Sequence, residues 1–78
     1  MTLGEALKQY RKAKNLLQKQ LAAEIGISLK HYTLIENDRA HPSSTVLKRI
    51  YATTDIVVEF SVNTDKRVSE YSVRYKTK

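Results

Sequence analysis

The sequence has 78 residues, a length that suits one small domain. It contains no cysteine, which excludes disulfides and thiolate metal sites, and no apolar run approaches the roughly 20 residues that a membrane helix needs. Fourteen Lys and Arg against eight Asp and Glu give a net charge of +6, a balance that favours polyanionic partners.

The first predicted element is a helix over residues 3–13. Thr2 and Glu5 have the spacing of a capping box, in which Thr2 is the N-cap. Apolar residues then recur at helical spacing and form one stripe: Leu3, Ala6, Leu7, Tyr10 and Ala13. Basic residues in the last turn suit the negative end of the helix dipole, and residues 15–16 form the turn that follows.

Two short helices separated by a glycine come next. A helix over residues 18–25 is indicated by Leu21, Ala22 and Ile25. Gly26 lies where the backbone must leave this helix, at a position that favours positive φ. Ser28 is a good N-cap for the second helix, over residues 29–36. Such a pair makes a helix-turn-helix, whose second helix is presented to DNA.

Helical spacing also separates the two faces of residues 29–36. Tyr32 and Ile35 lie three positions apart and should face inward. Leu29, Lys30 and Thr33 are expected to face outward, and Leu34 to face outward in part.

A polar connection over residues 37–42 leads to a fourth helix, capped by Ser43 or Ser44. The apolar positions of this helix are Val46, Leu47, Ile50 and Tyr51. After Asp55 the apolar period changes to two, with a polar turn at residues 63–67. This alternation predicts a β-hairpin, whose apolar positions are Ile56, Val58, Phe60, Val62, Tyr71, Val73 and Tyr75.

Residues 3–52 resemble the Cro/CI-type helix-turn-helix family, also called XRE, of phage repressors and bacterial regulators. The residues that carry the resemblance are Gln18, Leu21-Ala22, Gly26-Ile27-Ser28, Ile35 and Glu36-Asn37, with Arg11 upstream and Pro42-Ser43 downstream. With the strand pattern, the resemblance implies one α+β domain. A lambda-repressor-like bundle of four to five helices would occupy residues 1–54. A C-terminal antiparallel β-hairpin would follow over residues 55–78, an architecture similar to Cro-like and HipB-like proteins.

The resemblance also implies a structural pair, in which Arg11 bonds Glu36 at the end of the third helix. Such a partly buried pair fixes geometry more than it adds stability. The sequence departs from the family at two nearby positions. Asp38 stands where glycine is frequent, so a different turn is expected after Asn37. Tyr32 stands where Val or Ile is usual, so its hydroxyl should reach the core edge or a phosphate.

Contacts with double-stranded DNA are expected from the start of the second helix at Gln18, from residues 28–34 and from the loop over residues 37–43. The residues expected to read bases are Leu29, Lys30, Thr33 and Leu34. Lysine reads guanine edges, and leucine can touch a thymine methyl group. The residues expected to contact phosphates are Gln18, Ser28, Tyr32, Asn37, Arg39, His41 and Ser43.

The hairpin is expected to join two copies of the chain. A lone hairpin has two exposed edges and cannot bury both of its faces. The candidate dimerisation residues are Ile56, Val57, Val58, Phe60, Tyr71 and Val73. A twofold dimer would place two recognition helices about one DNA turn, roughly 34 Å, apart. The alternative is a monomer whose hairpin folds over the helices.

The function expected from these features is sequence-specific regulation by a dimeric repressor of phage or prokaryotic type. An alternative is an antitoxin that binds a toxin protein and autoregulates its operon, and another is a non-specific basic nucleic-acid binder. The N-terminus lacks a signal-peptide pattern, so a cytoplasmic, nucleoid-associated chain without a membrane partner is expected. His31 and His41 lack cysteine or acidic partners at ligand spacing. A bound metal is therefore not expected. No serine lies in a motif typical of a catalytic nucleophile, and there is no glycine-rich phosphate-binding loop, so neither a cofactor nor enzyme activity is expected.

Overall fold

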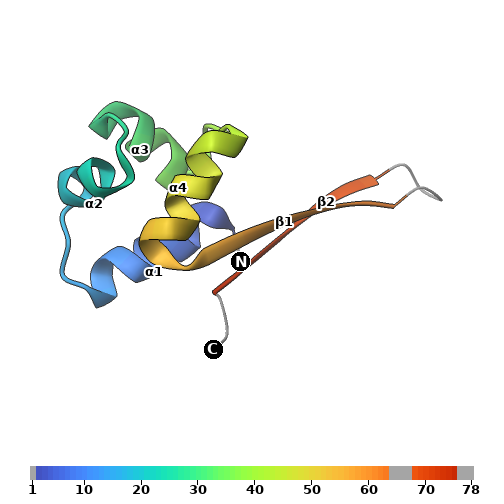
Figure 1. The fold of residues 1–78 in the computed structure, drawn as a ribbon, viewed down its shortest axis with the longest axis horizontal. Coiled ribbons are helices and arrows are strands. Elements are labelled where there is room, and N and C mark those ends of the chain that lie inside the picture. The colour runs from blue at the N-terminus through green and yellow to red at the C-terminus, as the bar shows by residue number, and fades with distance from the viewer. Residues whose placement is uncertain (1, 64–67, 76–78) are drawn as a thin grey trace.

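Four helices lie in the segments whose apolar residues recur at helical spacing. The structure, a computed structural model, describes the backbone of residues 2–63 and 68–75 and the side chains of residues 2–58. Within that part of the chain the elements are α1 (Leu3–Ala13), α2 (Gln18–Ile25), α3 (Leu29–Glu36), α4 (Ser44–Thr54), β1 (Ile56–Asn63) and β2 (Val68–Tyr75). Figure 1 shows the helices packed as one bundle from which the strands extend. The predicted helix-turn-helix bundle is confirmed.

Side chains near each helix start set where it begins. The hydroxyls of Thr2, Ser28 and Ser43 each accept a hydrogen bond from the backbone N–H three positions on, at 3.1, 3.1 and 3.3 Å. α2 starts differently, because the backbone N–H of Leu17 donates to Oε1 of Gln20 at 2.7 Å. These bonds satisfy backbone groups that a helix end otherwise leaves unpaired.

Left-handed residues mark the places where the chain leaves a helix. Gly26 has φ 88°, and three non-glycine residues share the positive sign, Asn15 at 56°, Asp38 at 58° and Asp55 at 61°. Asn and Asp enter this region more readily than other side chains do. A different turn is expected from the sequence after Asn37 because Asp38 replaces glycine. Asp38 nevertheless adopts the left-handed backbone conformation that glycine favours.

The core draws on all four helices and on the first residue of β1. Its buried hydrophobic residues are Ala6, Leu7, Leu21, Ala22, Ile25, Tyr32, Ile35, Val46, Ile50 and Ile56. Ile56 is only 1% exposed, so its predicted role as a contact between subunits is wrong: it already packs against this chain's helices. On α4, Leu47 is half-buried and Tyr51 is exposed, although the apolar stripe predicts both inside.

β1 and β2 pair antiparallel, in a register that runs from Ile56 opposite Tyr75 to Asn63 opposite Val68. The sheet contacts α1, and β1 also contacts α4. Residues 64–67 lie outside the described part of the chain, as do the side chains of Phe60, Tyr71 and Val73. The hairpin as a complete unit, and its contacts between subunits, therefore stay predictions.

The junction between α4 and β1 is tied by side chains. The hydroxyl of Thr54 donates to the carbonyl of Ile50 at 2.7 Å and accepts the N–H of Ile56 at 3.2 Å. The hydroxyl of Tyr10 on α1 donates to the carbonyl of Thr53 at 3.2 Å. These bonds attach the start of the strand to the bundle. Within the described residues, no helix combines the length and the hydropathy that crossing a membrane requires.

Candidate nucleic-acid interface

The turn between α2 and α3 is built by Gly26. Its φ of 88° and ψ of 33° end α2, and its N–H donates to the carbonyl of Ala22 at 2.9 Å. The next residue, Ile27, is half-buried against the core. Nη1 of Arg49, on α4, donates to the carbonyl of Gly26 at 3.2 Å and supports the turn from outside. Arg49 lies far along the chain, and no local sequence signal indicates this contact.

α3 has one buried face and one exposed face. Tyr32, Ile35 and Glu36 are buried. On the other face Lys30 is exposed, Leu29 is 48% exposed and Leu34 is 37% exposed. Thr33, the fourth residue predicted to read bases, is half-buried beside them. The predicted base-reading residues therefore share the face of α3 that the bundle does not cover.

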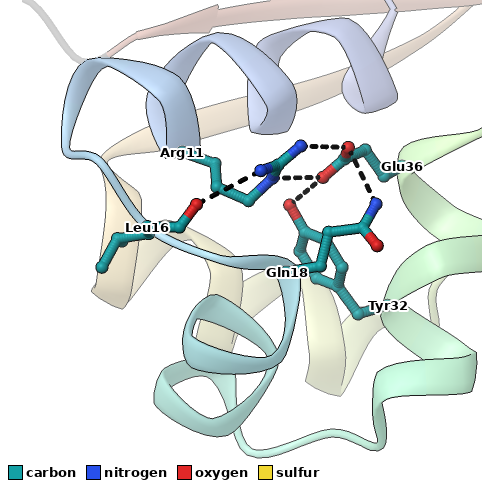
Figure 2. A network of polar contacts seen from close by, with 5 residues as sticks. All are labelled: Arg11, Leu16, Gln18, Tyr32 and Glu36. Atoms are coloured by element: carbon teal, nitrogen blue, oxygen red, sulfur yellow. Dashed lines mark hydrogen bonds and ion pairs between the residues drawn. The ribbon is translucent and has the colours of Figure 1, made fainter.

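A polar network around Glu36 holds α3 against the rest of the bundle (Figure 2). Arg11 on α1 forms a two-pronged ion pair with it, through Nε to Oε2 at 3.1 Å and Nη2 to Oε1 at 3.0 Å. Nε2 of Gln18 donates to Oε1 at 3.2 Å, and the hydroxyl of Tyr32 donates to Oε2. Nη1 of Arg11 also donates to the carbonyl of Leu16 at 3.2 Å. The carboxylate thus links α1, the start of α2 and α3.

The network shifts the ionisation of its members. Burial acts to raise the pKa of Glu36, but hydrogen bonds from Arg11, Tyr32 and Gln18 outweigh it and lower that pKa. Burial, and then the bond to Glu36, raise the pKa of Tyr32. The hydrogen bond to Glu36 raises the pKa of Arg11. At neutral pH the site holds one carboxylate and one guanidinium, both partnered, and a neutral phenol.

The prediction that Tyr32 contacts a DNA phosphate is wrong. The side chain has 0% exposure and its hydroxyl is already donated to Glu36. The sequence leaves two destinations open for this hydroxyl, and the internal carboxylate is the one it reaches. A buried hydroxyl gains more from such an acceptor than from leaving the core.

The other predicted phosphate contacts lie at the surface or close to it. Gln18 is half-buried, and its amide already bonds Glu36. The exposed members of the set are Ser28, Asn37, Arg39, His41 and Ser43. Ser28 and Ser43 also cap α3 and α4, where the first N–H groups of a helix favour anions. Whether these residues touch DNA stays a prediction.

A second contact joins the end of α3 to the start of α1. The carboxylate of Asp38 accepts the hydroxyl of Thr2 at 2.7 Å and the N–H of Gly4 at 3.1 Å. A Cβ built on Gly4 would lie 2.1 Å from the carbonyl oxygen of Glu36, so the two helices meet as closely as backbone allows. Sequence reasoning assigns Thr2 as a cap but misses Gly4 and Asp38, because the contact spans more than thirty residues.

Comparisons with known proteins agree with this geometry. Residues 7–56 match the family model described as Helix-turn-helix. Over its 78 residues the chain is 32% identical to the immunity repressor protein of Bacillus phage phi105, and it spans 54%, about half, of that protein's length. No solved structure matches the chain. The match covers the turn, both helices around it and the Arg11–Glu36 pair, and the chain therefore belongs to the Cro/CI-type (XRE) helix-turn-helix family.

Proposed function

We propose that this chain is a sequence-specific double-stranded DNA-binding repressor of phage or prokaryotic type, which reads the major groove with α3. The observation that carries the proposal is the division of α3 into two faces. The inward face is locked by the core and by the Glu36 network, while Leu29, Lys30 and Leu34 are exposed. A rigid helix with one uncovered face suits insertion into a groove about 12 Å wide.

Charge and the relative support the same proposal. The net charge of +6 favours the phosphate backbone, whose contacts supply most of the sequence-independent affinity. Gln18 stands at the N-terminus of α2 and Ser28 at the N-terminus of α3, and helix N-termini favour phosphates. The relative from phage phi105 is named an immunity repressor protein. By analogy, the mechanism proposed is occlusion of a promoter by the bound protein.

The proposed active form is a homodimer joined through the C-terminal strands. An open apolar groove of about 250 Å³ lies between α4 and β1, lined by Leu47, Lys48, Tyr51, Val57 and Val58. Val57 and Val58 are each half-buried, so their covering is incomplete in one chain. A second copy that pairs with the strands would cover this groove and place two α3 helices on one DNA face.

The alternative role as an antitoxin has less support. The relative's name describes a repressor, which favours regulation as the main task. A toxin partner therefore forms no part of the proposal.

Selection of DNA from a random pool by the full chain, with its mass measured in solution, tests the function and the symmetry together. We expect two inverted half-sites with centres about 10 base pairs apart and the mass of a dimer. A monomer on a single half-site would refute the dimer, and the absence of any enriched sequence would refute specific binding.

A matched pair of variants tests the assignment of α3. Lys30→Ala should weaken binding to the selected site about tenfold, because a base contact is lost, and should change binding to random DNA far less. Lys8→Ala removes an equal charge from an exposed position of α1 and is the control. Equal losses by Lys30→Ala on selected and random DNA would show that Lys30 does not read a base.

A further inference from the structure

The two exposed leucines of α3 set this helix apart from the other described helices. Among the residues whose side chains the structure describes, the exposed large hydrophobic ones are Leu17, Leu29, Leu34 and Tyr51. Leu17 caps α2, so both leucines exposed within a described helix belong to α3. The exposed positions of α1 and α4 carry mainly polar or charged side chains such as Lys8, Lys12 and Arg49, together with the exposed Tyr51 of α4.

We propose that Leu29 and Leu34 are specificity-determining residues that bind thymine methyl groups in the major groove, on either side of the position read by Lys30. This inference rests on the proposed function and adds the chemical class of the bases that α3 selects. The C5 methyl of thymine is the apolar group that base edges present in this groove. A leucine side chain offers no hydrogen-bonding group, so it can gain affinity there only by burying that methyl.

Helix geometry places the two leucines at different base pairs. Five residues at about 100° and 1.5 Å each separate Leu29 from Leu34 by about 140° around the axis and 7.5 Å along it. Lys30 lies between them in angle, and Thr33 lies on the same arc. Neighbouring base pairs are about 3.4 Å apart, so the leucines cannot share one base pair.

The leucines also discriminate against other bases. A leucine pressed on a guanine or cytosine edge would remove water from polar atoms without replacing their hydrogen bonds, which is unfavourable. Selectivity would therefore come from attraction at thymine and from desolvation elsewhere.

The surroundings of the patch favour DNA over a protein partner. Two leucines divided by Lys30 offer far less apolar area than the roughly 800 Å² that each partner buries in a stable protein interface. The lysine and the net charge of +6 complement a phosphate-lined groove. A protein partner on this face becomes an outcome of the test.

Replacement of thymine by uracil, one position at a time, in the selected DNA site tests the inference with the full chain. Uracil lacks only the methyl group and keeps the same pairing and polar edge. We expect about fourfold weaker binding at each thymine that a leucine contacts, the factor that corresponds to a buried methyl group. Other thymines of the site should tolerate the change.

Three variants assign the effect to side chains. Leu29→Ala and Leu34→Ala should each bind the thymine site more weakly and should each lose the response to uracil at one position. Leu17→Ala, at an exposed leucine outside α3, should keep the full response and is the matched control. Far-UV circular dichroism of each variant confirms that the helices are retained.

Specific binding that ignores every uracil, or a selected half-site without thymine, would overturn the inference and leave the proposed function intact. If both α3 variants kept the uracil response at every position where the parent chain shows one, the inference would be overturned too, since the response would then reflect DNA shape. Full DNA affinity in both variants, which would leave the patch to a protein partner, would do the same. The absence of any sequence preference would instead refute the proposed function.

Discussion

Replacing Gly4 with alanine should destabilise this protein, although the same change in an ordinary helix is stabilising. Alanine would place a Cβ at 2.1 Å from the carbonyl oxygen and 2.8 Å from the carbonyl carbon of Glu36, and at 2.9 Å from Oδ1 of Asp38. Two of these three atoms are backbone, which cannot rotate away. α1 would have to move relative to the end of α3.

Two opposing effects set the size of the change. Alanine in place of glycine stabilises a helix by roughly 0.5–1 kcal/mol, while an extra methyl group in a closely packed site destabilises by about 1–3 kcal/mol. The contact is with backbone, so the upper part of the second range applies and a net loss of about 1–2 kcal/mol is expected. For a domain of this size that loss lowers the melting temperature by roughly 5–15 °C.

Urea unfolding of Gly4→Ala, followed by circular dichroism, measures this loss. Lys8→Ala, at an exposed position of the same helix, is the control and should change stability by less than about 0.5 kcal/mol. A Gly4→Ala variant as stable as the parent, or more stable, would refute the close approach of α1 to α3.

Three further predictions concern the polar contacts. Tyr32→Phe removes the hydroxyl bonded to Glu36 and should cost about 1.5–3 kcal/mol in urea unfolding, with helix content unchanged; no loss would place the hydroxyl elsewhere. The folded pKa of Glu36 is lowered, so its ionised form stabilises the protein above the ordinary value of 4.5, and this contribution is lost as the pH falls through the folded pKa. Glu36→Gln should therefore differ most from the parent at neutral pH and least in acid, when urea midpoints are compared across pH. A gap that is constant with pH contradicts the assignment. Asp38→Ala loses the bonds to Thr2 and Gly4 and puts alanine in the left-handed region, whereas Asp38→Gly loses only the bonds. Thermal unfolding should rank the parent above Asp38→Gly and Asp38→Ala lowest, and the reverse order of the two variants would argue against a left-handed residue 38.

Local patterns predict most of the bundle. The presence of the helices α1 to α4, the caps at Thr2 and Ser28 and the left-handed Gly26 depend on neighbours within a few residues, and the structure agrees at each. The Arg11–Glu36 contact could be anticipated because the family resemblance supplied a pairing that spacing alone does not reveal.

Contacts between distant segments are what the sequence does not reveal. Three such features depend on how the helices pack: the bond between Asp38 and Thr2, the bond from Arg49 to the turn at Gly26, and the exposure of Tyr51. A helical stripe predicts only which residues are apolar. For Tyr32 the pattern predicted burial, but the competition between an internal carboxylate and a DNA phosphate could be resolved only with Glu36 in place.

The bonds at Thr54 have a consequence for the length of DNA that a dimer could span. No freely rotating residue separates the last turn of α4 from β1, since the Thr54 hydroxyl holds both Ile50 and Ile56. Strands that join two copies would therefore fix one separation and one rotation between the α3 helices. Inserting a single base pair between half-sites rotates one half-site about the DNA axis by about 35°. A rigid junction between α4 and β1 would not let the second α3 helix rotate by the same angle. Operator spacing would then be as selective as operator sequence.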